Sequence, residues 1–145
     1  MINEEGLEII KFYEKWEPSP YFCPAGLLTI GWGHVILPGE KFNAPISKEL
    51  GTELLLKDVR IAEKAVARLI KVPLGINQFS ALTSFTFNLG SGVLQNSTLR
   101  MKLNRGDYLG AGEQLNRFVY AKGKKLNGLI KRRQSETNLY MRDVK

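Results

Sequence analysis

The chain has 145 residues, of which 43% are apolar and 24% are charged, as in a single folded domain. This composition excludes a disordered chain. Cys23 is the only cysteine, which excludes an intramolecular disulfide and fits folding in a reducing compartment. No apolar run reaches the ~20 residues of a membrane-spanning helix. The acidic start MINEEGLEII is unlike a signal peptide. We therefore expect synthesis in the cytoplasm without a signal peptide, and a monomer.

The net charge of +7 is concentrated at one end of the chain. Residues 117–145 contain nine basic and two acidic side chains, whereas residues 1–116 contain twelve of each. The excess positive charge therefore lies in the last fifth of the sequence. Such a segment favours an anionic partner, for example nucleic acid, anionic lipid or the bacterial envelope.

The first predicted element is a helix from Asn3 to about Glu14, because Asn3 is a typical N-cap and apolar side chains follow at helical spacing. From Trp16 to about Asn43 the pattern changes, because Pro18, Pro20 and Pro24 exclude a continuing helix and four glycines mark turns or close backbone approach. We interpret this region as a small antiparallel sheet with irregular loops.

Helices are predicted for most of the remaining chain. Ser47 is expected to cap a long helix that ends near Ile70, with an apolar stripe along one face. Further helices are predicted over residues 77–89, about 97–104, about 107–119 and about 127–140, and Gly90 is expected to help end the first of these. The order of elements predicts an α+β fold.

Glu14 is the first candidate for chemistry, because it falls where the first helix ends and the sheet begins. The negative end of the helix dipole and partial burial beside Trp16 both favour a protonated carboxyl group, which a general acid requires. Cys23 and Thr29 follow in the predicted sheet, and a helix end facing a sheet can bring all three side chains to one cleft. Taken singly, each residue has an ordinary structural interpretation.

Taken together, these residues resemble a known signature. Glu14, Cys23 and Thr29 form a Glu-x8-Cys-x5-Thr pattern, followed by Ile-Gly-Trp-Gly-His at 30–34. This pattern resembles the active-site signature of phage-type lysozymes, glycoside hydrolase family 24. The resemblance continues through residues 77–90, 97–99, 103–108 and the Gly-Leu-x-x-Arg-Arg-x-x-Glu motif at 128–136. Most members have Asp where this chain has Cys23, and a subset has Cys.

The resemblance implies a lysozyme-like fold in one catalytic domain, residues 1–145. It implies a small β lobe at about 15–46, a connecting helix at about 47–71 and a helical lobe at about 72–145 that includes the N-terminal helix. Glu14 would protonate the leaving-group oxygen, Cys23 would position or activate water, and Thr29 would help to hold that water. Cys23 could act as a thiolate, as a thiol or as a nucleophile, so the stereochemical outcome stays open.

Several residues are expected to support the catalytic set. The family pattern implies that Arg132 or Arg133 pairs with Glu14, and Asn88 is a further candidate for a hydrogen bond to Glu14. His34 is the only histidine, so we predict neither a metal nor another cofactor. A charged hydrogen bond between His34 and Asp58 on the long helix is expected instead.

The resemblance implies an endolysin that cuts the β-1,4 bond between N-acetylmuramic acid and N-acetylglucosamine in peptidoglycan. Release through a holin-type membrane lesion would follow. One alternative is a cationic protein that acts on membranes or lipopolysaccharide through its basic C-terminal helix. Another is a nucleic-acid-binding module, although no specific nucleic-acid motif is present.

Overall fold

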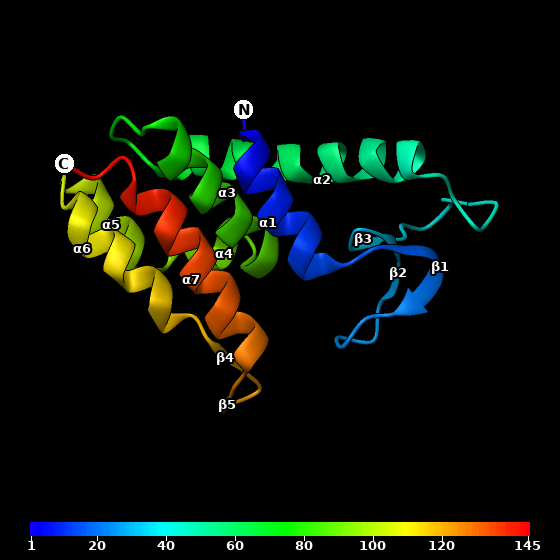
Figure 1. Ribbon diagram of the computed structural model, residues 1–145. Helices are drawn as coiled ribbons and strands as arrows, with labels where there is room; N and C mark the ends of the chain where they lie inside the picture. The colour runs from blue at the N-terminus through cyan, green and yellow to red at the C-terminus, as the bar shows by residue number, and fades with distance from the viewer.

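The computed structural model describes residues 1–145 as a small sheet and a larger group of helices at opposite ends of one long helix (Figure 1). The elements in chain order are α1 (Glu4–Glu14), β1 (Glu17–Phe22), β2 (Leu28–Gly31), β3 (His34–Val35), α2 (Lys48–Leu69), α3 (Ile76–Leu89), α4 (Ser91–Gln95), α5 (Thr98–Asn104), α6 (Tyr108–Gln114), a 3-10 turn η1 (Leu115–Arg117), β4 (Tyr120–Ala121), β5 (Lys124–Lys125) and α7 (Asn127–Met141). The predicted α+β class is confirmed.

Side-chain caps fix where the two predicted N-terminal helices begin. The side chain of Asn3 accepts a hydrogen bond from the backbone N–H of Gly6 at 2.9 Å, and Ser47 accepts one from Leu50 at 3.1 Å. These bonds satisfy N–H groups that have no partner within the helix. The start of α1 and of α2 therefore follows from local sequence.

The sheet is antiparallel in the order β1-β2-β3, so β1 is an edge strand. Pro18 and Pro20 lie in β1, and its pairing with β2 is irregular between Glu17 and Tyr21. An edge strand tolerates prolines because they lack the N–H that an inner strand would need. The sheet packs on α2 through a small cluster centred on Ile30.

The helices enclose the main core. Thirteen buried apolar residues, contributed by α2 to α7, form one cluster that includes Leu82, Phe85 and Tyr140. A second cluster of Ile10, Trp32, Leu55 and Val59 joins α1 and the sheet to α2. The end of α1, the sheet and the middle of α2 are thus packed against one another.

Two elements were not predicted. The segment after Gly90 continues as the short helix α4, and residues 120–125 form the β4–β5 hairpin before α7. Both are too short to show a period in the sequence. None of the helices combines the length and the apolar composition needed to cross a bilayer.

Candidate active site

Glu14 lies at a sharp change of chain direction. It is the last residue of α1, and the next residue, Lys15, has φ 62° and ψ 159°, a conformation that non-glycine residues rarely adopt. The chain therefore leaves the helix abruptly and enters β1. Gly33 lies directly beneath the Glu14 carboxylate. The side chain of Glu14 is 22% exposed, so it is held against protein but open to a ligand.

Arg132 of α7 binds the Glu14 carboxylate. Its Nη1 donates a hydrogen bond to Glu14 Oε2 at 2.8 Å, and the Arg132 side chain is only 3% exposed. The same guanidinium donates to the Ser84 carbonyl oxygen at 3.2 Å and to Glu136 Oε2 at 3.3 Å. A planar guanidinium can satisfy these acceptors simultaneously, which fixes the position of Glu14.

Arg133 belongs to the same network but does not contact Glu14. It forms an ion pair with the fully buried Glu136 at 2.6 Å and donates to Asn88 Oδ1 at 2.8 Å. The expected hydrogen bond between Asn88 and Glu14 is therefore not formed, because Asn88 is turned toward Arg133. Of the two candidate arginines, the structure pairs Arg132 with Glu14.

Cys23 and Thr29 lie on one hairpin. A tight turn follows β1, in which Cys23 N–H donates to the Leu27 carbonyl at 2.9 Å and the Gly26 N–H donates back to Cys23 at 2.8 Å. The Thr29 hydroxyl, at the start of β2, donates to the same Leu27 carbonyl at 2.8 Å. Because its proton is used there, the oxygen of Thr29 is free to accept a hydrogen bond from a water molecule.

The surroundings of Cys23 favour its thiolate. Hydrogen bonding from the backbone of Leu27 has the largest effect and lowers the pKa of the Cys23 thiol, burial opposes it as the next largest effect, and hydrogen bonding from the backbone of Ala25 adds to the lowering. Tyr21 lies on the same wall of the cleft, where burial, followed by the charges of Glu14 and Cys23, raises its pKa. Tyr21 therefore stays a hydroxyl donor beside them.

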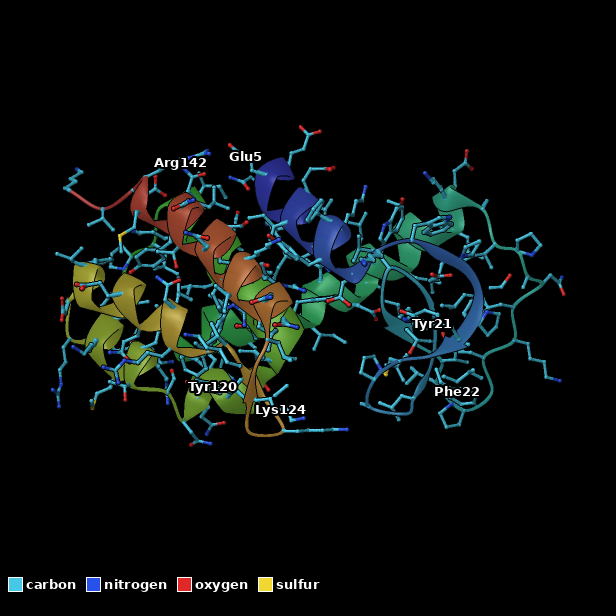
Figure 2. The ribbon with its side chains drawn as sticks, turned by 60° about the horizontal axis from the view of Figure 1, so that its bottom comes forward. Glu5, Tyr21, Phe22, Tyr120, Lys124 and Arg142 are labelled. Carbon is cyan, nitrogen blue, oxygen red and sulfur yellow. The ribbon has the colours of Figure 1, made fainter.

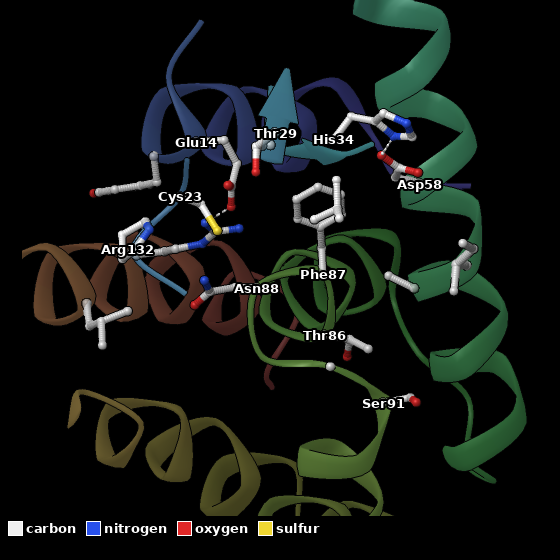
Figure 3. A pocket seen from close by; sticks show the side chains of 18 of the residues that line it. Glu14, Cys23, Thr29, His34, Asp58, Thr86, Phe87, Asn88, Ser91 and Arg132 are labelled. Atoms are coloured by element: carbon white, nitrogen blue, oxygen red, sulfur yellow. Dashed lines mark hydrogen bonds and ion pairs between the residues drawn. The ribbon is translucent and has the colours of Figure 1, made fainter. Parts of the chain in front are cut away.

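Glu14, Cys23 and Thr29 line one cleft of about 930 Å³ between the sheet and the helices. Figure 3 shows the three side chains directed toward the same end of the cleft, with Arg132 bonded to Glu14. Phe87 and Asn88 lie along the floor, and the cleft extends past Thr86 to Ser91. A groove that extends beyond the candidate acid Glu14 can bind a polymer chain on either side of the bond that is cut.

His34 anchors the sheet to α2. Its Nδ1 lies 2.7 Å from Asp58 Oδ2, and its Nε2 lies 2.9 Å from Glu40 Oε1, so both ring nitrogens face carboxylates (Figure 3 shows the Asp58 pair). Burial opposes the charged imidazolium, but the hydrogen bonds and charges of Asp58 and Glu40 outweigh it and raise the pKa of His34. The Leu37 N–H, and next His34, lower the pKa of Glu40.

The sequence predicted no partners for three members of these networks, although one of them, Glu136, ends the motif at 128–136. Glu40 follows His34 by six residues in a loop, which gives no periodic signal. Glu136 lies four residues after Arg132 and three after Arg133, a helical spacing that could have identified it. Ser84, which donates to Glu136 Oε2 at 2.6 Å, has no such signal. No three His, Cys, Asp or Glu side chains are grouped as metal ligands.

The chain is similar to known proteins along nearly its whole length. The family model described as phage lysozyme matches residues 11–136. An endolysin of Acyrthosiphon pisum secondary endosymbiont phage 1 is 40% identical over 143 residues, which cover 96% of this chain and 97% of that protein.

Solved structures agree with this match. An endolysin from Escherichia coli O157:H7 phage FAHEc1 has a TM-score of 0.87 at 37% identity, covering 99% of this chain and 95% of that one. The muramidase domain of SpmX from Asticaccaulis excentricus has a TM-score of 0.86 at 31% identity, covering 97% of each chain. The chain belongs to the phage lysozyme family.

Proposed function

We propose that this chain is a muramidase that hydrolyses the β-1,4 bond from N-acetylmuramic acid to N-acetylglucosamine in bacterial peptidoglycan, with Glu14 as its acid. One observation supports this most directly. The Glu14 carboxylate is held by Arg132 at the wall of an elongated cleft, where Cys23 and Thr29 are directed to the same point. The substrate also agrees with the family to which the chain belongs.

In the proposed reaction the protonated Glu14 donates its proton to the glycosidic oxygen, and the bond between that oxygen and C1 of the muramic acid breaks. A water molecule attacks C1 from the other face. It donates one hydrogen bond to the free lone pair of Thr29 and transfers its other proton to the thiolate of Cys23. Glu14 then takes up a proton from solvent and the Cys23 thiol releases one, which restores both groups for the next cycle. This route is a single displacement.

Arg132 has two effects on this step. Its charge stabilises the Glu14 carboxylate that remains after proton transfer. Its fixed position orients Glu14 toward the glycosidic oxygen. Because Arg132 also binds the buried Glu136, its charge is shared between two carboxylates. Glu14 and Glu136 together balance Arg132 and Arg133, so the network has no net charge when all four are ionised.

Mass spectrometry of digested peptidoglycan tests the reaction. We expect reducing-end muramic acid products, initially as the α anomer because a single displacement inverts the centre. Glu14→Gln should abolish their release, because the amide cannot act as the acid. Anhydro-muramic products would instead indicate a lytic transglycosylase, and a β anomer would indicate a covalent intermediate on Cys23. Cut peptides would overturn the assignment.

We further propose that the sheet and the helices act as the two lobes of one catalytic domain, and that the protein works as a monomer. The wall lies beyond the inner membrane, so the enzyme needs a route to it, which we propose to be a holin-type lesion. Expression alone should then leave cells intact, whereas opening the inner membrane should cause lysis. Lysis without permeabilisation would contradict this route.

The membrane-active alternative is less well supported by the geometry of α7. Arg132 and Arg133 are buried, and Arg142 is paired with Glu5. The C-terminal helix therefore does not present the cationic face that binding to anionic lipid through this helix would need. Contact of residues 117–145 with anionic lipid would have to use other side chains. The Glu14→Gln variant separates the two functions, because a membrane disruptor would keep its effect.

A further inference from the structure

The free positive charge of the chain is concentrated between η1 and the start of α7. Arg132, Arg133 and Arg142 form ion pairs with Glu14, Glu136 or Glu5. None of the six ion pairs involves the five basic residues of 117–131 that remain, and no acidic residue occurs in that stretch. These five side chains are exposed: Arg117, Lys122, Lys124, Lys125 and Lys131.

The β4–β5 hairpin lies beside the rim of the cleft. Leu126, Gly128 and Leu129, which follow the hairpin directly, line the cleft. In Figure 1 the hairpin projects from the start of α7, on the side where the β1–β2 hairpin also projects. Figure 2 shows Tyr120 and Lys124 of the hairpin on one side and Tyr21 and Phe22 of the sheet on the other. A substituent that leaves the cleft beside Leu126 would meet the hairpin, because Leu126 follows Lys125 directly.

A second hollow of about 600 Å³ borders the hairpin, because Tyr120 and Lys125 are among the residues that line it. Its nine lining residues include the cations Arg117 and Lys125, the amides of Gln134 and Asn138, and the ring of Tyr120, which is 61% exposed. None of the nine is acidic. Guanidinium, ammonium and amide donors without a nearby acid suit a carboxylate.

The tip of the hairpin has a lysine at a position where asparagine or glycine would make a more stable turn. Lys122 and Gly123 both have positive φ, at 52° and 77°, as in the two-residue turns that prefer Asn-Gly. Lysine in this conformation costs about 1 kcal/mol relative to glycine. The tip also has no large apolar side chain, which a hairpin that inserts into a membrane would need.

We propose that the β4–β5 hairpin and the hollow beside it bind the carboxylates of the peptide branches attached to the glycan strand in the cleft. Adjacent strand residues face opposite sides. Lys125 therefore faces the hollow, and Lys124 faces away from it. A peptide branch that crosses the β4–β5 hairpin would therefore meet Lys124 on one face and Lys125 on the other. This inference rests on the proposed muramidase function and adds a specificity surface outside the catalytic cleft.

The test compares wild type with Lys124→Gln/Lys125→Gln on purified peptidoglycan and on peptidoglycan whose peptide carboxylates are amidated. The readouts are KM and kcat for release of reducing ends at low salt. We expect the double variant to raise KM about fivefold on native peptidoglycan at unchanged kcat, as two exposed ion pairs would. On amidated material the two proteins should have equal KM.

Two controls keep the test independent of folding and of overall charge. Lys48→Gln/Lys64→Gln removes the same charge from exposed positions of α2 outside the cleft lining, and should leave KM unchanged. Lys122→Asn removes a cation from the hairpin while suiting its turn, and should raise KM without lowering Tm.

Three results would overturn the inference: an unchanged KM, an equal rise on amidated peptidoglycan, or a loss confined to binding of phosphatidylglycerol vesicles. The last would assign the surface to anionic lipid. A wild-type protein that releases no reducing ends from either material would instead overturn the proposed function itself, so the two failures are distinguishable.

Discussion

The carboxylate of Glu14 lies directly against the α-carbon of Gly33. A Cβ at position 33 would lie 2.5 Å from Glu14 Oε1, and Gly33 also has φ +75°, a conformation that favours glycine. The Gly-Trp-Gly-His segment therefore has a specific task in the site, because it forms the surface on which the proposed acid rests.

Gly33→Ala should reduce kcat by about 100-fold, because the methyl group has to displace the Glu14 carboxylate from its position. Gly39→Ala is the matched control, since Gly39 has a similar φ of +88° but open space around its α-carbon. Both variants should lose about 1 kcal/mol of unfolding free energy from the backbone strain. Equal activity in the two variants would contradict the contact with Glu14.

Arg132→Lys should reduce kcat about tenfold while the protein still folds, because an ammonium group cannot satisfy Glu14, Glu136 and the Ser84 carbonyl together. The control is Arg142→Lys, in the exposed pair with Glu5, which should change stability by less than about 0.5 kcal/mol. Steady-state kinetics with a thermal melt would measure both. Wild-type kcat in Arg132→Lys would remove the positioning role.

Replacements of Cys23 test how water is activated. Cys23→Ser should lose most of the activity, roughly 100-fold, because a serine hydroxyl is a poor base, whereas Cys23→Asp should keep much of it. Full activity in Cys23→Ala would exclude any chemical role for the thiol.

The pH profile gives a second readout of Cys23. Because its pKa is lowered, the thiolate should form below the ordinary thiol value of about 8.5, so the rate at which iodoacetamide alkylates Cys23 should rise with pH and level off before that value. In Cys23→Ser no alkylation should occur, because Cys23 is the only cysteine. A wild-type rise centred at or above about 8.5 would contradict the thiolate base.

His34 should make stability depend on pH. Its folded pKa is raised, so its contribution is complete below the unfolded value of about 6.5 and is lost as pH rises through the folded value. The pKa of Glu40 is lowered, so its contribution is present above about 4.3 and is lost as pH falls. The His34 contacts with Asp58 and Glu40 are therefore strongest between about pH 4.5 and 6.5.

His34→Gln should lower the unfolding free energy at pH 6 by about 2 kcal/mol, the order expected for charged hydrogen bonds. Denaturant unfolding at pH 6 and pH 8 would measure it. The wild type should lose stability between these two values, whereas the variant should lose less. The same pH dependence in both proteins would show that His34 does not titrate in this range.

Lys15→Gly should raise the unfolding free energy by about 1 kcal/mol, because φ 62° and ψ 159° strain any residue with a side chain. Lys15→Ala removes the lysine side chain but keeps the strain, and should leave stability unchanged. Thermal melts of the two variants separate these causes. Equal Tm values would show that the backbone at Lys15 is not strained.

Local sequence determined the elements that have their own signals. The caps Asn3 and Ser47 and the apolar periods predicted α1 and α2, and the pattern of Glu14, Cys23 and Thr29 indicated the family, which the comparisons confirm. The short helix α4 and the β4–β5 hairpin were not predicted, because elements of a few residues are too short to show a hydrophobic period.

Tertiary structure alone decided which partners meet. Arg132 and Arg133 are neighbours in sequence and project about 100° apart around α7, so only the rotation of that helix against α1 and α3 selects Arg132 for Glu14. The same rotation turns Arg133 toward Asn88 and Glu136. That rotation is set by packing of α7 on α1 and α3, which are distant from it in the sequence, and the local patterns that define each helix do not describe this packing.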